Sequence, residues 1–139
     1  MAVTHYLYGP SLKNVGANNV DLEATTFTVH LMTSDHAYSK NNEYWATVSA
    51  NETTGQPDYE AKDLAGQALG YSAGITTLTA SSETEFCSSG SIKAFHAVLA
   101  ASSYLISSID FGGAEESVDG EFKITWTDNK ILTMTVSTS

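Results

Sequence analysis

The chain has 139 residues and a formal net charge of −10, which comes from sixteen acidic residues and six lysines with no arginine. This length fits one domain, which we expect to span residues 1–139. The negative charge repels a phosphate backbone, and arginine is the side chain that most often clamps phosphate, so the composition argues against nucleic-acid binding. No apolar run approaches the length of about 18 residues that spans a bilayer, and we expect no membrane association.

The first 20 residues include three consecutive large apolar or aromatic side chains, Tyr6, Leu7 and Tyr8, ahead of any clear strand. No basic stretch followed by an apolar core is present, so we expect that the chain has no secretion signal. We expect it to be synthesised in the cytoplasm. Pro10 favours one or two helical turns over residues 8–16, with Gly16 as the stop. We therefore interpret residues 1–20 as an N-terminal arm that lies on a neighbouring molecule.

Residues 25–33 form the first clear strand, because Phe27, Val29 and Leu31 share one face and polar residues share most of the other. The next segment, residues 34–64, is polar and holds a possible short helix at 43–48. A loop this long inside a compact domain is more often functional than idle.

Seven further short strands are predicted by alternating polarity between breaks rich in Gly, Ser, Ala and Asp: 66–72, 75–80, 83–87, 91–99, 103–111, 121–127 and 130–137. Both faces of 91–99 are largely apolar, which places it near the middle of a sheet. The last two strands flank Asp128 and Asn129, residues that tolerate positive φ, and we expect them to form a hairpin. The prediction is an all-β, mainly antiparallel β-sandwich or partly closed barrel of seven or eight strands, with one or two short helices in the N-terminal half.

The sequence contains no recognisable catalytic or metal site. Its four histidines are far apart and lack metal-ligand spacing, no nucleophile-elbow motif is present, and Cys87 has no cysteine partner. His30 and His96 fall within strands, where a packed or hydrogen-bonded core histidine is the ordinary interpretation. We expect no enzyme activity, no metal and no cofactor.

Aromatic residues gather in the weakly regular first half of the chain, where a small core has least use for them. Loop aromatics are enriched in protein interfaces. For Tyr44 and Trp45 the alternative is that they cap the sandwich, and the sequence does not separate the two interpretations. The candidate partner-binding residues are Tyr6, Leu7, Tyr8, Tyr44, Trp45 and Tyr59.

Six segments occur in the order and approximate spacing of a family of small virion structural proteins of tailed bacteriophages, which the chain resembles over most of its length. The family's glycine-rich turn after the third segment is replaced here by the looser TGQPDYEA of residues 54–61. The segments are LYGPSLK (7–13), VHLMTS (29–34), EYWATVSANE (43–52), IDFG (109–112), GEFKITW (120–126) and ILTMTV (131–136).

This resemblance implies a non-enzymatic role in the virus particle. The first expectation is a capsid decoration, or cement, protein on the capsid exterior, which binds the outer shell and bridges neighbouring major capsid proteins, with self-association as a trimer. A tail-associated or fibre-base protein of the same particle is the alternative. A third hypothesis, from a different class, is a carbohydrate-binding β-sandwich in which Tyr44, Trp45 and Tyr59 stack on sugars.

Overall fold

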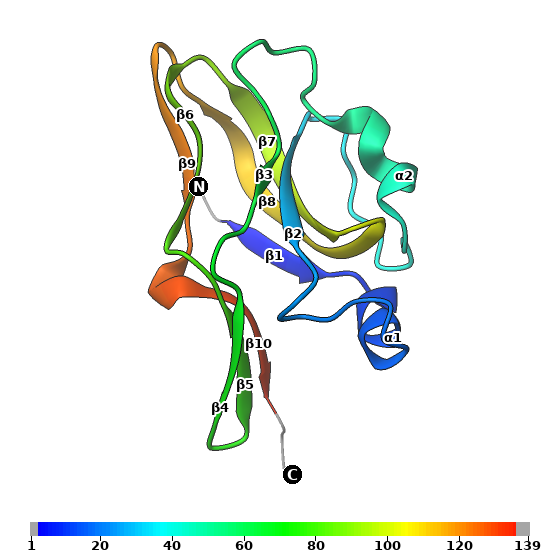
Figure 1. Cartoon of the computed structure of the whole chain (residues 1–139). Helices are drawn as coiled ribbons and strands as arrows, with labels where there is room; N and C mark the ends of the chain where they lie inside the picture. The colour runs from blue at the N-terminus through cyan, green and yellow to red at the C-terminus, as the bar shows by residue number, and fades with distance from the viewer. Residues whose placement is uncertain (1–2, 136–139) are drawn as a thin grey trace.

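The computed structural model describes residues 3–135 and contains ten strands and two short α-helices (Figure 1). The helices are α1 (Pro10–Gly16) and α2 (Trp45–Val48), with 3₁₀ turns at Ser49–Asn51 and Thr127–Asn129. The strands are β1 (Thr4–Leu7), β2 (Phe27–Met32), β3 (Lys62–Asp63), β4 (Ala68–Ser72), β5 (Ile75–Thr79), β6 (Glu83–Gly90), β7 (Lys93–Ala101), β8 (Tyr104–Glu116), β9 (Gly120–Thr125) and β10 (Lys130–Thr135).

The predicted all-β, antiparallel, sandwich-like fold is confirmed. Both predicted helices form, α1 beginning at Pro10 and ending at Gly16. All eight predicted strands are present, although residues 136–137 of the last one lie outside the described residues. β1 and β3 were not predicted. The four residues of β1 are all exposed and β3 has only two residues, so neither shows an alternation of apolar and polar side chains.

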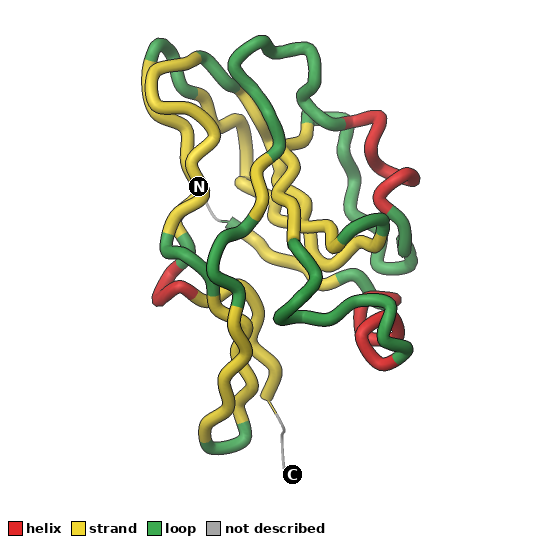
Figure 2. Tube along the Cα trace, in the orientation of Figure 1, coloured by secondary structure: helices red, strands yellow, loops and turns green. Residues whose placement is uncertain are grey.

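A five-stranded antiparallel sheet in the order β1-β8-β7-β2-β3 forms the centre of the molecule. β7 is its middle strand, as its two apolar faces predicted. Leu99 of β7 is buried on one face of the sheet and Val98 on the other. Both faces of this sheet are therefore covered, and the chain forms layers on either side of it (Figure 2).

The expected terminal hairpin between residues 121–127 and 130–137 is wrong. β9 pairs with β6 and β10 pairs with β5, so residues 75–90 and 120–135 form one long antiparallel ribbon. Two backbone hydrogen bonds join its halves: Ala80 N–H to Asn129 O (3.0 Å) and Trp126 N–H to Ser82 O (2.7 Å). Asp128 and Asn129 do adopt positive φ, 55° and 60°. Alternation of apolar and polar side chains identifies a strand but does not determine which strand it pairs with. The ribbon is favoured because it brings β5 and β6 over the same core as β9 and β10.

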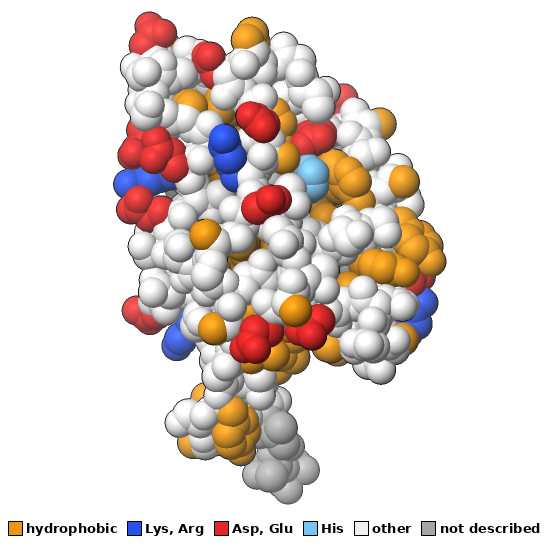
Figure 3. All heavy atoms as spheres, in the orientation of Figure 1, with side chains coloured by type: hydrophobic (Ala, Val, Ile, Leu, Met, Phe, Trp, Pro, Cys, Tyr) orange, Lys and Arg blue, Asp and Glu red, His pale blue; other side chains and the backbone are white. Residues whose placement is uncertain are grey.

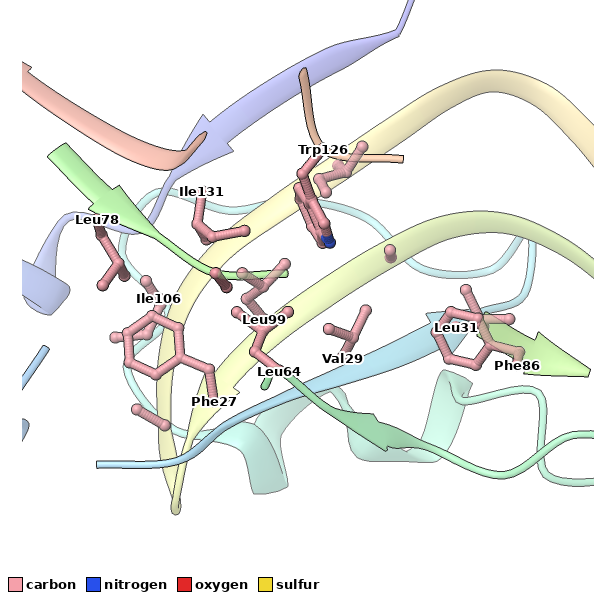
Figure 4. Packing of buried hydrophobic residues seen from close by; sticks show 14 of the residues in the cluster. Phe27, Val29, Leu31, Leu64, Leu78, Phe86, Leu99, Ile106, Trp126 and Ile131 are labelled. Carbon is pink, nitrogen blue, oxygen red and sulfur yellow. The ribbon is translucent and has the colours of Figure 1, made fainter. Parts of the chain in front are cut away.

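The main core lies between one face of the sheet and this ribbon. Figure 4 shows Phe27, Val29 and Leu31 of β2 packed toward side chains from the ribbon, among them Leu78, Phe86 and Ile131. A smaller core on the opposite face contains Tyr8, Met32, Val48, Val98 and Leu105. The segment that follows β2 and includes α2 covers this second face, which gives the predicted long loop a structural role.

The segment interpreted as an arm on a neighbouring molecule, residues 1–20, is integrated into the fold in the part that the structure describes. β1 pairs antiparallel with β8, from Thr4 opposite Asp110 to Leu7 opposite Ser107. Tyr8 is fully buried in the second core, and its carbonyl accepts a hydrogen bond of 2.7 Å from the Ser11 hydroxyl. The segment belongs to the fold because this aromatic side chain is part of the core. No helix within residues 3–135 is long and apolar enough to cross a membrane.

Candidate interaction surfaces

The three N-terminal candidates have different environments. Tyr6 is exposed and its ring stacks on Tyr38, with centroids 4.8 Å apart. Leu7 is exposed at the sheet edge. Tyr8 is buried, with its ring tilted against Tyr38 at a centroid distance of 5.0 Å, and burial raises the pKa of its phenol to about 12. Tyr8 is therefore a core residue and not a partner-binding one.

The other three candidates do not form a shared flat platform. Tyr44 is exposed beside Tyr104, with ring centroids 5.7 Å apart. Trp45 is half-buried and one face of its ring is covered by His30 at 3.8 Å. Tyr59 is half-buried against Phe86. Of these three rings only Tyr44 has the exposure that the interface interpretation needs.

Tyr59 belongs to a hydrogen-bonded network around Glu52, and Trp45 meets this network by stacking on His30. The Glu52 carboxylate lies 2.7 Å from His30 Nδ1 and accepts a 2.6 Å hydrogen bond from the Tyr59 hydroxyl. That hydroxyl also accepts a 3.0 Å hydrogen bond from the Leu31 N–H. Burial opposes ionisation of Glu52, but the hydrogen bonds from His30 and Tyr59 outweigh it and lower the carboxyl pKa. Burial, followed by the hydrogen bond to Glu52, raises the pKa of Tyr59. The network fastens the long loop to β2.

A second cluster of polar side chains contains His36 and His96, on the face of the sheet that the long loop covers. His36 Nε2 lies 3.1 Å from Ser108 Oγ, the His36 and His96 rings meet edge to face at 5.1 Å, and His96 Nδ1 lies 3.8 Å from Asp110 Oδ1. Burial lowers the pKa of both imidazoles, that of His36 to about 4. The pair of Ser108 and His36 contains the atoms of a nucleophile and a base, but both side chains are buried. The cluster runs from the buried His36 and Ser108 to the exposed side chain of Asp110.

The geometry of the described residues gives no support for a metal site. Within residues 3–135, no group of three or more His, Cys, Asp or Glu side chains is arranged to hold an ion. The acidic residues near the β8–β9 turn are spread along the strands, where Lys93 approaches Glu116 at 4.0 Å and Lys123 approaches Glu121 at 3.3 Å.

The β4–β5 hairpin is a candidate interaction surface that sequence reasoning missed. It projects away from the body of the molecule (Figure 1), and apolar side chains gather on it in Figure 3. Tyr71 is 73% exposed, Leu69 40% and Ile75 39%. Residues 64–82 contain no Asp, Glu, Lys or Arg, in a chain with 22 such residues. This uncharged run was the available signal, because an exposed strand normally carries charge to prevent association.

Comparison of the chain with family models, with curated proteins and with solved structures found no match.

Proposed function

We propose that this chain is a structural protein of a tailed-bacteriophage particle, and specifically a decoration protein that binds the outer capsid shell and bridges neighbouring major capsid proteins. The observation that carries the proposal is the uncharged β4–β5 hairpin, which extends from the body with Leu69, Tyr71 and Ile75 exposed. The succession of segments that resembles small virion proteins supports the same role.

The physical properties of the chain suit such a role. A net charge of −10 keeps free copies apart in solution. Burying an apolar or aromatic side chain at an interface contributes about 1.5–3 kcal/mol, so three hairpin side chains supply a modest affinity. A shell that offers many identical sites to self-associated copies, such as a trimer, converts this affinity into stable attachment through avidity.

The proposal is tested by rebinding purified protein to phage particles that lack it. The triple variant Leu69→Ser, Tyr71→Ser, Ile75→Ser should remain folded, because these side chains lie outside the core, and should lose occupancy on the shell. Val118→Ser is the matched control, since Val118 is 70% exposed on a different turn. Full occupancy by the triple variant would contradict attachment through the hairpin. Binding confined to the tail would favour the tail-associated alternative.

A further inference from the structure

An open groove runs along the side of the molecule where the five-stranded sheet and the ribbon both end. One hollow of about 450 Å³ lies between β1, α1 and β10, and a second of about 500 Å³ lies between β1, the end of β8 and β9. The two hollows are neighbours, because both are lined by His5, Thr127 and Lys130. We call this the edge groove; its apolar walls include Leu7, Ile106, Phe111, Ile124, Trp126 and Ile131.

The wall formed by β1 offers unpaired backbone groups. β1 is the terminal strand of the sheet in the described residues, with β8 on one side only. The Tyr8 N–H donates to Ile106 O at 3.0 Å. Because backbone direction alternates along an antiparallel pair, the N–H groups of Tyr6 and Thr4 also point toward β8, and those of His5 and Leu7 point away from it. The His5 backbone and the Leu7 amide are therefore placed to pair with one more strand, whereas the Leu7 carbonyl already accepts a hydrogen bond from the Tyr38 hydroxyl.

The charges at the groove are unequal along its length. The hollow between β1 and β9 is lined by Glu115, Glu116 and Glu121, whereas the hollow beside α1 is mostly apolar. Lys123 also lines the acidic end, but it already contacts Glu83 at 3.0 Å and Glu121 at 3.3 Å. Glu116 approaches Lys93 at 4.0 Å and Lys130 also lines this hollow, so among the described residues Glu115 alone of the three glutamates has no lysine within 4.0 Å. An occupant would therefore meet apolar side chains at one end and a small excess of carboxylates at the other.

We propose that the edge groove binds an extended segment of another polypeptide, which adds a strand beside β1, places alternate apolar side chains between the sheet and the ribbon, and carries Lys or Arg at the acidic end. Strand addition to an open sheet edge gives affinity through the main chain and specificity through alternate side-chain pockets. The proposal goes beyond capsid attachment through the hairpin, because it concerns a different surface and can be tested without particles.

The test uses a synthetic peptide of alternating valine and threonine with two lysines at one end. We expect saturable binding that weakens with salt, together with slower hydrogen exchange at the amides of His5 and Leu7. The same peptide with glutamates in place of the lysines should bind about tenfold more weakly or worse, which corresponds to about 1.4 kcal/mol. Equal affinity for the two peptides would overturn the assigned partner charge.

Two substitutions at one position separate strand addition from other binding. His5→Pro removes an amide that points away from β8, so the sheet should persist while peptide binding falls about tenfold or more. His5→Ala keeps the amide and should bind within about threefold of the original chain. Thermal unfolding of both variants checks that they are folded. If His5→Pro binds the peptide as well as His5→Ala, strand addition beside β1 is wrong.

The carboxylates have a matched test of their own. The triple variant Glu115→Gln, Glu116→Gln, Glu121→Gln should lose the preference for the lysine peptide and most of the salt dependence. Sedimentation of the unmodified chain, with and without peptide, tests whether a second copy of the chain occupies the groove instead. A self-associated species that dissociates when peptide binds would show that a second copy fills the groove, and would overturn the proposal of a basic partner.

Discussion

The His36 imidazole lies 3.1 Å from the Ser108 hydroxyl, and both side chains are buried on the face of the sheet that the long loop covers. The loop therefore contributes a titratable ring to the packed interior of the protein. Burial, with a smaller contribution from the neighbouring His96, lowers the pKa of this ring from 6.5 to about 4.

The free energy of unfolding should decrease as the pH falls from about 6.5 to about 4. In this interval the unfolded chain binds a proton at residue 36 and the native chain does not, so acid favours unfolding. Urea titrations at several pH values measure this slope. His36→Gln should make the slope shallower, with a residual contribution from His96, whose pKa burial also lowers. Identical slopes for the two proteins would show that His36 is not held neutral by the fold.

Removing the Tyr59 hydroxyl should destabilise the protein. Tyr59→Phe leaves the Leu31 amide without its acceptor and removes one of the two partners of Glu52 Oε2, which keeps His30. The expected loss is about 1–3 kcal/mol in the free energy of unfolding, measured by urea denaturation. Tyr44→Phe is the control, because Tyr44 is exposed, and it should change stability by less than about 0.5 kcal/mol.

The N-terminal aromatic residues should differ sharply in their effect on stability. Tyr8→Ala empties part of the second core and should cost about 3–5 kcal/mol. Tyr6→Ala removes only an exposed ring stacked on Tyr38 and should cost about 0.5–1.5 kcal/mol. A chain shortened by residues 2–8 should therefore be less stable, which thermal unfolding can show. A shortened chain as stable as the original would contradict this contribution of the segment to the fold.

The pairing of β9 with β6 can be tested through Trp126. Its indole N–H donates a 3.0 Å hydrogen bond to the Thr84 hydroxyl, and both residues are buried. Thr84→Val keeps the volume but leaves the indole N–H without an acceptor, which should cost about 1–3 kcal/mol and alter tryptophan fluorescence. In a terminal hairpin Trp126 would have no contact with residue 84, and the substitution would have little effect.

Most strands could be predicted from the sequence because alternating polarity is a local property. Phe27, Val29 and Leu31 face the main core as their spacing indicates. Pairing partners are not local: Phe122 and Ile124 have the same alternation whether β9 pairs with β10 or with β6. The ribbon between residues 75–90 and 120–135 was missed for that reason.

The candidate surface was harder to predict than the fold. Aromatic composition pointed to the first half of the chain, where Tyr8 proved to be core and Trp45 to be stacked on His30. The hairpin with Tyr71 was predicted as two strands, but alternation does not reveal that it leaves the body. The edge groove depends on β1, whose four exposed residues give no strand pattern.

The most direct test of the proposed function is to locate and count this chain in images of the complete phage particle. We predict many copies on the outer shell, each with the β4–β5 hairpin against major capsid protein. A few copies at the tail would contradict the decoration role, and absence from purified particles would contradict a structural role in the virion.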